Sequence, residues 1–396
     1  MNTSKRGREI YDDFALNTSD IYPDKYTLSV CEEIAEQLPE AEALAQEKGV
    51  TPTAHYYTPP ESQMAAHKVG DSLALSLYAR DIHAKKVISQ TVAFMGTTAK
   101  IITGDATKVY LLDHSSGLGC SLVNGTDHVW IQNWKRLNPK GILLTYINSD
   151  VFLKSMSDFI TTSRNTDEIA AYAIKQYPGQ PILIAPDKYL GAIMKIRALK
   201  ILEEKYDIKA SEEIQNLIQI YDHSFQGNNA SCYIHEKFDQ DRVDTLMDMY
   251  PDAILMMHPE CGCIVDCRLR LEQGKIAHEQ AYIASTEKMI HIARASSAST
   301  CIVATEAGHL WALRKLVPEK TFIPVSPNAH CEFMKGNNLT KLIRSLRENR
   351  WEIIFCDDCQ DCIDPRFPYE DDKFIHIPRH LAEKAKQPID RMFAFQ

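Results

Sequence analysis

The sequence has no long apolar run. None of its apolar segments approaches the roughly 20 residues that a helix needs to cross a bilayer. Its first residues, MNTSKRGREIYDDFALNTSD, lack the apolar centre of a secretory signal. It also lacks an excess of positive charge. The net charge of −9 argues against nucleic acid or an anionic membrane as the main partner. We therefore expect a soluble, cytoplasmic protein.

The chain is otherwise typical of a globular protein. It has 396 residues, which is more than one hydrophobic core usually organises, so we expect two or three domains. Hydrophobic residues make up 44% and charged residues 24%. Eleven cysteines without a secretory signal favour a reducing compartment, where clustered thiols are more often metal ligands than disulfides.

A four-part pattern recurs three times along the chain. A short strand ends in polar or ring-bearing residues, a helix begins with hydroxyl residues, a second apolar strand follows, and a turn then carries a cysteine. The strand ends are AHYY (54–57), LLTYINS (143–149) and ILMMHPE (254–260), and the helix starts are GDSLALSLYA (70–79), TTSRNTDEIAAYA (161–173) and ASTEKMIHIARA (284–295). The second strands are KVISQTVAF (86–94), PILIAPD (181–187) and TCIVATE (300–306), and the turns are GLGC (117–120), NASC (229–232) and PNAHC (327–331).

Strands that alternate with helices predict βαβ units and parallel sheets, with functional residues at the carboxyl ends of the strands. We therefore predict an α/β fold of three small parallel-sheet domains in a pseudo-threefold arrangement around a central active site. The predicted parts are a helical lead-in (1–50, with Gly49 as a helix stop), domain 1 (51–138), domain 2 (139–240) and domain 3 (241–396), which includes a Cys-rich insertion (356–362) and a C-terminal helix.

The three repeated cysteines, Cys120, Cys232 and Cys331, lack any close CxxC partner. A lone cysteine is often a small buried hydrophobe. Matched positions in the repeat instead predict that the three thiolates converge on one iron–sulfur or zinc site. A cluster normally takes four cysteines, so a missing fourth ligand leaves an iron open to substrate.

Polar pairs at the strand ends could serve a common ligand. Their spacing of two places both members on one side of a strand, although ordinary strand-end hydrogen bonding is the alternative. Glu260 is the candidate general base. The pairs are His55 and Tyr57, Tyr146 and Asn148, and His258 and Glu260.

Hydroxyl residues near the helix starts are either ordinary N-caps or part of an anion pocket, because helix N-termini favour anions. If the repeat brings the three starts together, they form a pocket for a small anionic metabolite. The residues concerned are Ser72, Ser163, Ser285 and Thr286.

The chain resembles the quinolinate synthase family over about residues 50–396. The matching motifs, in order, are AH-x-Y (54–57), GDSL (70–73), FM-x-x-TAKI (94–101), GCSL (119–122), Y-x-NS (146–149), TS-x-N (162–165), PDK-x-LG (186–191), C-x-xHEKF (232–238), HPEC (258–261), STE-x-x-I (285–290), TE-x-G (305–308), C-x-xMK (331–335) and PIDRMFAF (388–395).

The resemblance implies condensation of iminoaspartate with dihydroxyacetone phosphate to quinolinate for NAD biosynthesis, and an enzyme that supplies iminoaspartate as partner. It implies a [4Fe–4S] cluster on Cys120, Cys232 and Cys331. Glu260 would be the acid/base group, assisted by Tyr57, His55 and His258. The substrate-binding residues it implies are His55, Ser72, Tyr146, Asn148, Thr162, Ser163, His258, Glu260, Ser285 and Thr286.

Five positions depart from the family pattern: Thr58 replaces Gln, Thr97 replaces Glu, Asp150 replaces Thr, Phe333 replaces Asn, and Arg164 replaces a small residue. Arg164 brings a cation close to the anion-binding helix start. These differences have two possible explanations: neutral sequence drift at positions around the pocket, or a changed substrate. One alternative is therefore a paralogue with the same fold and cluster that acts on a different small acid. The other is a non-catalytic iron–sulfur redox sensor.

Six further cysteines lie in two close groups and are not explained by one cluster: Cys261, Cys263, Cys267, Cys356, Cys359 and Cys362. The last three form C-x2-C-x2-C and could hold a second metal, Zn or Fe–S. Redox-sensitive exposed thiols or a disulfide pair are the alternatives.

Overall fold

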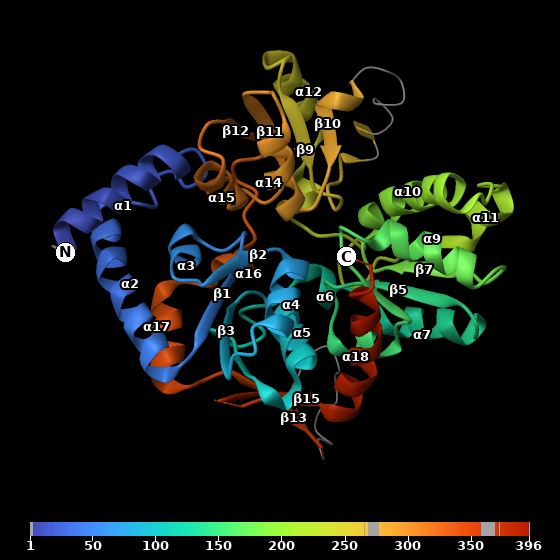
Figure 1. The fold of residues 1–396 in the computed structure, drawn as a ribbon, viewed down its shortest axis with the longest axis horizontal. Helices are drawn as coiled ribbons and strands as arrows, with labels where there is room; N and C mark the ends of the chain where they lie inside the picture. Colours follow the sequence, from blue (N-terminus) through green and yellow to red (C-terminus); the bar gives the residue numbers. More distant parts are fainter. Residues whose placement is uncertain (1–2, 265, 268–276, 358–368, 372, 396) are drawn as a thin grey trace.

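Three sheets surround a common centre in the computed structural model, which describes residues 3–264, 266–267, 277–357, 369–371 and 373–395 (Figure 1). In each sheet, four strands follow one repeated order, in which the second strand of the unit is followed by the first, third and fourth. The orders are β2-β1-β3-β4 in unit 1, β6-β5-β7-β8 in unit 2 and β10-β9-β11-β12 in unit 3. All these neighbours pair in parallel. The predicted α/β fold of three small parallel-sheet units is confirmed.

Each unit alternates strands and helices. Unit 1 contains β1 (Thr51–His55), α3 (Pro60–Met64), β2 (Lys68–Gly70), α4 (Ser72–Asp81), β3 (Lys86–Gln90), α5 (Ala93–Thr103), η1 (Gly104–Ala106), β4 (Lys108–Tyr110) and α6 (Ser121–Asn124). Unit 2 contains α7 (His128–Leu137), β5 (Ile142–Tyr146), α8 (Val151–Met156), β6 (Phe159–Thr161), α9 (Thr166–Gln176), β7 (Ile182–Ala185), α10 (Lys188–Tyr206), α11 (Glu212–Leu217), β8 (Ile218–Ile220) and η2 (His235–Lys237). Unit 3 contains α12 (Gln240–Met249), β9 (Ile254–Met257), η3 (His278–Gln280), β10 (Ala281–Ile283), α14 (Thr286–Ala295), β11 (Thr300–Ala304), α15 (His309–Leu316), β12 (Thr321–Pro324) and α16 (Glu332–Lys335).

Local sequence explains where these elements begin and end. The central strands β5, β7 and β9 are continuous apolar runs and are buried along their whole length, as expected for parallel strands covered on both faces. Polar caps begin the helices that follow: Asp71 accepts the backbone N–H of Ala74 in α4, and Asp150 that of Leu153 in α8. One predicted strand (86–94) is shorter than expected, because β3 ends at Gln90 and Ala93 already begins α5.

The predicted helical lead-in consists of α1 (Thr3–Thr18) and α2 (Leu28–Lys48). Gly49 ends α2 in the left-handed conformation (φ 61°), which a glycine adopts at little cost. The two helices run along the edge of the molecule, where α2 contacts α17 and α1 contacts α15 (Figure 1).

The C-terminal segment corrects the predicted extent of domain 3. The elements concerned are α17 (Leu339–Glu348), β13 (Glu352–Cys356), β14 (Tyr369–Glu370), β15 (Phe374–Pro378) and α18 (Arg379–Met392). β13 pairs antiparallel with β4 and so extends the sheet of unit 1, with β15 and β14 beyond it. α18 then packs on α8 and β6 of unit 2. The C-terminal segment thus joins units 1 and 2 instead of continuing unit 3.

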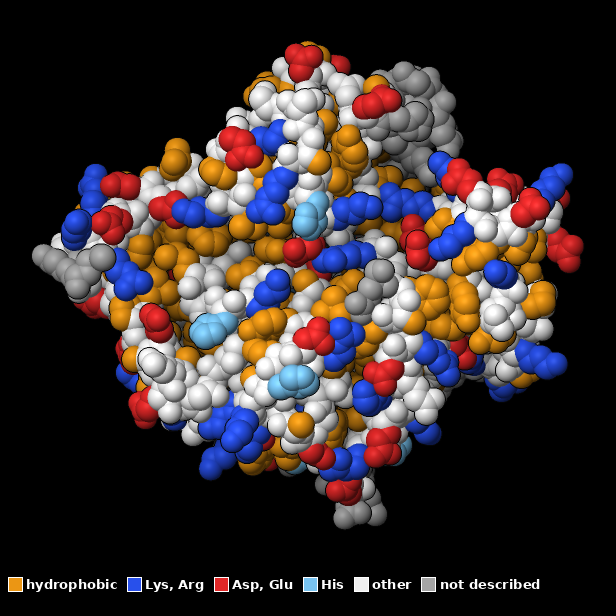
Figure 2. Space-filling model, in the orientation of Figure 1, with side chains coloured by type: hydrophobic (Ala, Val, Ile, Leu, Met, Phe, Trp, Pro, Cys, Tyr) orange, Lys and Arg blue, Asp and Glu red, His pale blue; other side chains and the backbone are white. Residues whose placement is uncertain are grey.

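The surface carries charges of both signs. Over the face shown in Figure 2, Lys and Arg side chains are interspersed with Asp and Glu side chains. Among the helices that the structure describes, none combines the length and the apolar character that a membrane span requires.

Candidate active site

One cavity lies where the three units meet, at the carboxyl ends of their strands. The structure brings nearly all the predicted site residues to its wall: His55, Tyr57, Ser72, Cys120, Tyr146, Asn148, Thr162, Ser163, Cys232, His258, Glu260, Thr286 and Cys331. Ser285 lies outside this lining. Its hydroxyl accepts the backbone N–H of Lys288 and caps α14, which is the structural role that the sequence left open.

The fold places equivalent residues of the three units side by side. The first strand of each unit (β1, β5 or β9) delivers the polar pair that follows it, and the second strand leads into the hydroxyl-bearing turn. The loop after the fourth strand (β4, β8 or β12) delivers one cysteine. The repeated strand order therefore explains why positions far apart in sequence line one cavity.

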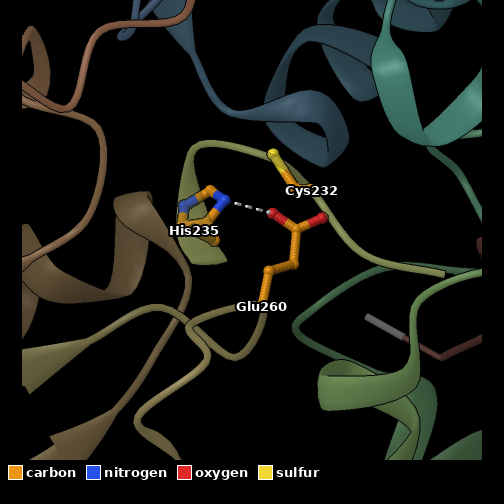
Figure 3. A group of neighbouring side chains, drawn as sticks. All are labelled: Cys232, His235 and Glu260. Carbon is orange, nitrogen blue, oxygen red and sulfur yellow. Dashed lines mark ion pairs between the residues drawn. The ribbon is translucent and has the colours of Figure 1, made fainter. Parts of the chain in front are cut away.

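Glu260 is one of three carboxylates that line this cavity, with Asp71 and Glu306, and it is only 3% exposed. Its Oε2 lies 3.1 Å from His235 Nδ1 and 3.2 Å from His258 Nδ1, and its Oε1 accepts the Asn148 amide at 3.2 Å. Figure 3 shows the imidazole of His235 and the carboxylate facing each other beside Cys232. Burial alone would raise the pKa of Glu260, but His235, His258 and the Tyr146 hydroxyl together lower it to about 2. The group is therefore ionised at neutral pH.

Tyr57 and His55 provide protonated groups in the same cavity. The Tyr57 hydroxyl lies 2.7 Å from Thr305 Oγ1, and burial keeps its pKa well above the usual value. The backbone N–H of Tyr57 donates to His55 Nδ1 at 3.1 Å, so the proton of the neutral ring sits on Nε2. Burial lowers the pKa of His55 to about 4, which keeps the ring neutral at pH 7. His235 Nε2 also faces Thr305 Oγ1, at 3.5 Å.

The three thiols lie near one another. Burial raises the pKa of Cys120 to about 12 and that of Cys331 to about 11, and it raises the pKa of Cys232 as well. After burial and the Glu260 carboxylate, Cys120 and Cys331 also raise the pKa of Cys232, as expected for cysteines that line one cavity. Three soft donors on one wall of a largely buried cavity fit an iron–sulfur cluster, whose positive irons would stabilise the thiolate form.

Comparison with known proteins agrees with this geometry. Residues 39–394 match the family model described as "Quinolinate synthetase A protein". The quinolinate synthase of Pyrobaculum aerophilum is 32% identical over 89% of this chain and 97% of its own length. The quinolinate synthase of Chlorobaculum parvum is 32% identical over 95% of this chain and 98% of its own length. That of Thermus thermophilus is 32% identical over 89% of this chain and 94% of its own length.

This chain belongs to the quinolinate synthase family.

The uncharged departures from the family pattern mostly lie behind the cavity wall. The hydroxyl of Thr58 donates to the carbonyl of His55 at 2.8 Å, and that of Thr97 donates to the carbonyl of Phe94 at 3.0 Å. Both threonine side chains are buried. Phe333 does line the cavity, and its ring lies so close to Gly119 that a Cβ there would meet it at 3.3 Å.

The two charged departures have side-chain partners. Asp150 caps α8 and lies 2.7 Å from Nε2 of the buried His128. The guanidinium of Arg164 donates to Asp71 Oδ2 from Nε at 3.0 Å and from Nη2 at 2.8 Å. Neither Asp150 nor Arg164 lines the cavity of this family member, so neither adds an unpaired charge to it.

Several residues near the cavity were missed by the sequence analysis as site residues. His235 and Thr305 lie inside quoted motifs, C-x-xHEKF and TE-x-G, and their position at strand or loop ends was the signal available. Glu306, which follows Thr305, is fully buried and accepts the backbone N–H of Cys331 at 3.0 Å and Lys335 Nζ at 2.7 Å. Lys335 also donates to the carbonyl of Tyr57. This buried ion pair thus links one predicted cluster ligand to one predicted catalytic residue.

The six additional cysteines fall into a buried group and a group that the structure describes only in part. Cys261, Cys263 and Cys267 are buried in the apolar core of unit 3, so they are not exposed redox-sensitive thiols. Cys356 ends β13, whereas Cys359 and Cys362 lie outside the described residues. Within the described part of the chain, the close group of three potential metal ligands is Cys232, His235 and Glu260, whose donor atoms lie within 4.8 Å of one another. The predicted second metal at Cys356, Cys359 and Cys362 stays a prediction.

Proposed function

We propose that this protein is a cytoplasmic quinolinate synthase that condenses iminoaspartate with dihydroxyacetone phosphate to form quinolinate, with loss of phosphate and two waters. The observation that carries the proposal is that Cys120, Cys232, Cys331 and Glu260 line one cavity together with the hydroxyls of all three units. A sensor would have no use for that set of acid/base and anion-binding groups.

The proposal assigns a [4Fe–4S] cluster to Cys120, Cys232 and Cys331. When bound, the cluster would supply a Lewis-acid iron without a protein ligand, able to polarise a substrate oxygen. His235 and Glu260 lie next to Cys232, so they would act on a substrate oxygen bound beside this cysteine.

The protein's own groups account for the proton transfers of a condensation. Glu260 is ionised and accepts a proton from the substrate carbon that forms the new bond. Tyr57 retains its proton and, with the Nε2–H of His55, returns protons to oxygens that leave as water. His258 lies against Glu260 and assists the transfer.

The anionic ends of the substrates would be held by hydroxyl and amide groups from three different units. A carboxylate or phosphate at these turns also faces helix N-termini, which favour anions. Ser285 contributes by capping the helix that presents Thr286. The binding set is Ser72, Tyr146, Asn148, Thr162, Ser163 and Thr286.

The departures from the family pattern favour the family's own substrates over those of a paralogue. Four of the five are buried or paired outside the cavity, so the charge and the hydrogen-bonding groups on its wall are those that the family motifs provide. Phe333 is the one of the five departures that changes a side chain lining the cavity.

The test is anaerobic reconstitution with iron and sulfide, followed by an assay with iminoaspartate and dihydroxyacetone phosphate, with iminoaspartate generated in place by a supplying enzyme. Quinolinate should form in proportion to cluster occupancy. Full occupancy without detectable quinolinate would refute the proposal and favour the paralogue.

A further inference from the structure

An ion pair joins the hydroxyl-bearing turns of units 1 and 2. Arg164 follows β6 of unit 2, and Asp71 follows β2 of unit 1, so the two residues come from equivalent places in the repeat. Arg164 donates twice to Asp71 Oδ2, at 3.0 and 2.8 Å. The other oxygen of Asp71, Oδ1, accepts the backbone N–H of Ala74 and caps α4. Both carboxylate oxygens of Asp71 are therefore engaged.

Asp71 lines the active-site cavity, next to Ser72. Its side chain is 10% exposed and that of Arg164 is 28% exposed, so water screens the pair only in part. Without a partner, a carboxylate on this wall would repel the carboxylates and the phosphate that Ser72, Thr162 and Ser163 are proposed to bind. Arg164 supplies the matching positive charge from behind the wall.

The charge of Asp71 acts on a residue of the cavity wall. Burial lowers the pKa of His55, and Asp71 is the charged neighbour that most opposes this effect. Burial and the hydrogen bond to Glu287 raise the pKa of the next residue, Tyr56; Asp71 raises it further, whereas Arg164 lowers it. At Tyr56, which lies between the cavity residues His55 and Tyr57 in sequence, the two charges therefore act in opposite directions.

We propose that Arg164 determines the affinity of this enzyme for its anionic substrates by offsetting the charge of Asp71, without touching the substrate itself. This inference rests on the proposed function, which supplies the anions. The family pattern has a small residue at this position, so the charge balance is a property of this chain. Arg164 acts through Asp71 and is a positioning residue, not a catalytic one.

The test is a charge cycle on the iron-loaded protein under anaerobic conditions. The variants are Arg164→Gln, Asp71→Asn and the double variant, in which asparagine keeps the α4 cap. Calorimetry measures the binding of malate and of inorganic phosphate at fixed ionic strength, and kinetics measure KM and kcat. Arg80→Gln is the matched control, because Arg80 pairs with Asp81 at the exposed far end of the same helix, at 2.6 Å.

The expected result is a loss of affinity of about tenfold in Arg164→Gln, a rise in KM of similar size and little change in kcat. Asp71→Asn should bind the anions more tightly, and the double variant should return close to the wild type. Arg164→Lys keeps the charge but not the two-nitrogen contact, so it should retain most of the affinity. A merely structural role would not give recovery in the double variant.

Two outcomes overturn the inference: wild-type affinity in Arg164→Gln, or a double variant as weak as Arg164→Gln, which would mean that Arg164 does not act through Asp71. Failure of the proposed function gives a different result. In that case the iron-loaded wild-type protein forms no quinolinate, whereas the anion affinities of the variants still report on the charge pair.

Discussion

Lys335→Met should destabilise the protein strongly, because it removes the lysine that pairs with the buried carboxylate of Glu306 and leaves only His330, at 3.6 Å, beside it. Glu306 is 0% exposed, and Lys335 Nζ lies 2.7 Å from its Oε1. Burial alone would raise the pKa of Glu306, but the charge of Lys335 lowers it. Burial alone would lower the pKa of Lys335, but the attraction of Glu306 is larger and raises it. Removing one member of such a pair costs about 3–5 kcal/mol in unfolding free energy.

The sign of both shifts fixes the pH range of this effect. Glu306 contributes stability above its unfolded pKa, and this contribution is lost as the pH falls through its lower folded value. Lys335 contributes stability below its unfolded pKa, and this is lost as the pH rises through its higher folded value. The cost of Lys335→Met should therefore be constant around neutral pH.

The assay is urea unfolding under anaerobic conditions, with Lys315→Met as the matched control. Lys315 pairs with Asp13 at 2.8 Å but is 45% exposed, so its loss should cost at most about 1 kcal/mol. The double variant Lys335→Met/Glu306→Gln should lose less than the sum of the two single variants, because no buried charge remains. Equal destabilisation in Lys335→Met and Lys315→Met would refute the reasoning.

Four further outcomes are expected. Glu260→Gln should lower kcat by about 10²–10⁴ while the iron content stays unchanged, because it removes the proton acceptor and no proposed ligand; a kcat within a few-fold of wild type would exclude it as the base. Cys232→Ala should remain soluble but lose the visible absorption of the cluster, and an unchanged spectrum would show that the ligand assignment is wrong. Thr305→Val removes the 2.7 Å hydrogen bond to Tyr57 and should lower kcat about fivefold, as measured at saturating substrate. Phe333→Asn restores the residue common in the family, so quinolinate formation should persist, and its loss would point to an altered substrate.

The repeat made much of the site predictable from sequence. Each unit combines an apolar first strand with polar residues at its end, and these carboxyl ends meet at one centre in a parallel α/β unit. The cysteines could be placed for the same reason. The short strands were not predicted: β2, β6 and β10 have three residues each, too few to show a periodicity. They hold their place through pairing with β1, β5 and β9.

Long-range partners could not be predicted. The pairing of β13 with β4 joins segments on opposite sides of two whole units, and nothing local in either strand specifies it. The same holds for charge partners. Arg164 looked like a new cation beside the anion site, but its partner Asp71 lies in another unit. Whether a charge is free or paired depends on the tertiary fold, so sequence departures alone could not decide between drift and a changed substrate.

The threefold repeat gives three equivalent positions different chemistry. The second member of the polar pair that follows the first strand is Tyr57 in unit 1, Asn148 in unit 2 and Glu260 in unit 3. Three carboxylates around one cavity would repel each other and raise each other's pKa. The single carboxylate of Glu260 instead remains ionised, because an amide donor lies 3.2 Å from it and imidazole nitrogens lie 3.1 and 3.2 Å from it. A repeated frame with unlike residues therefore permits a single carboxylate at this repeated position. The proposed compensation of Asp71 by Arg164 follows the same requirement, because an unpaired negative charge on the wall weakens the binding of an anion.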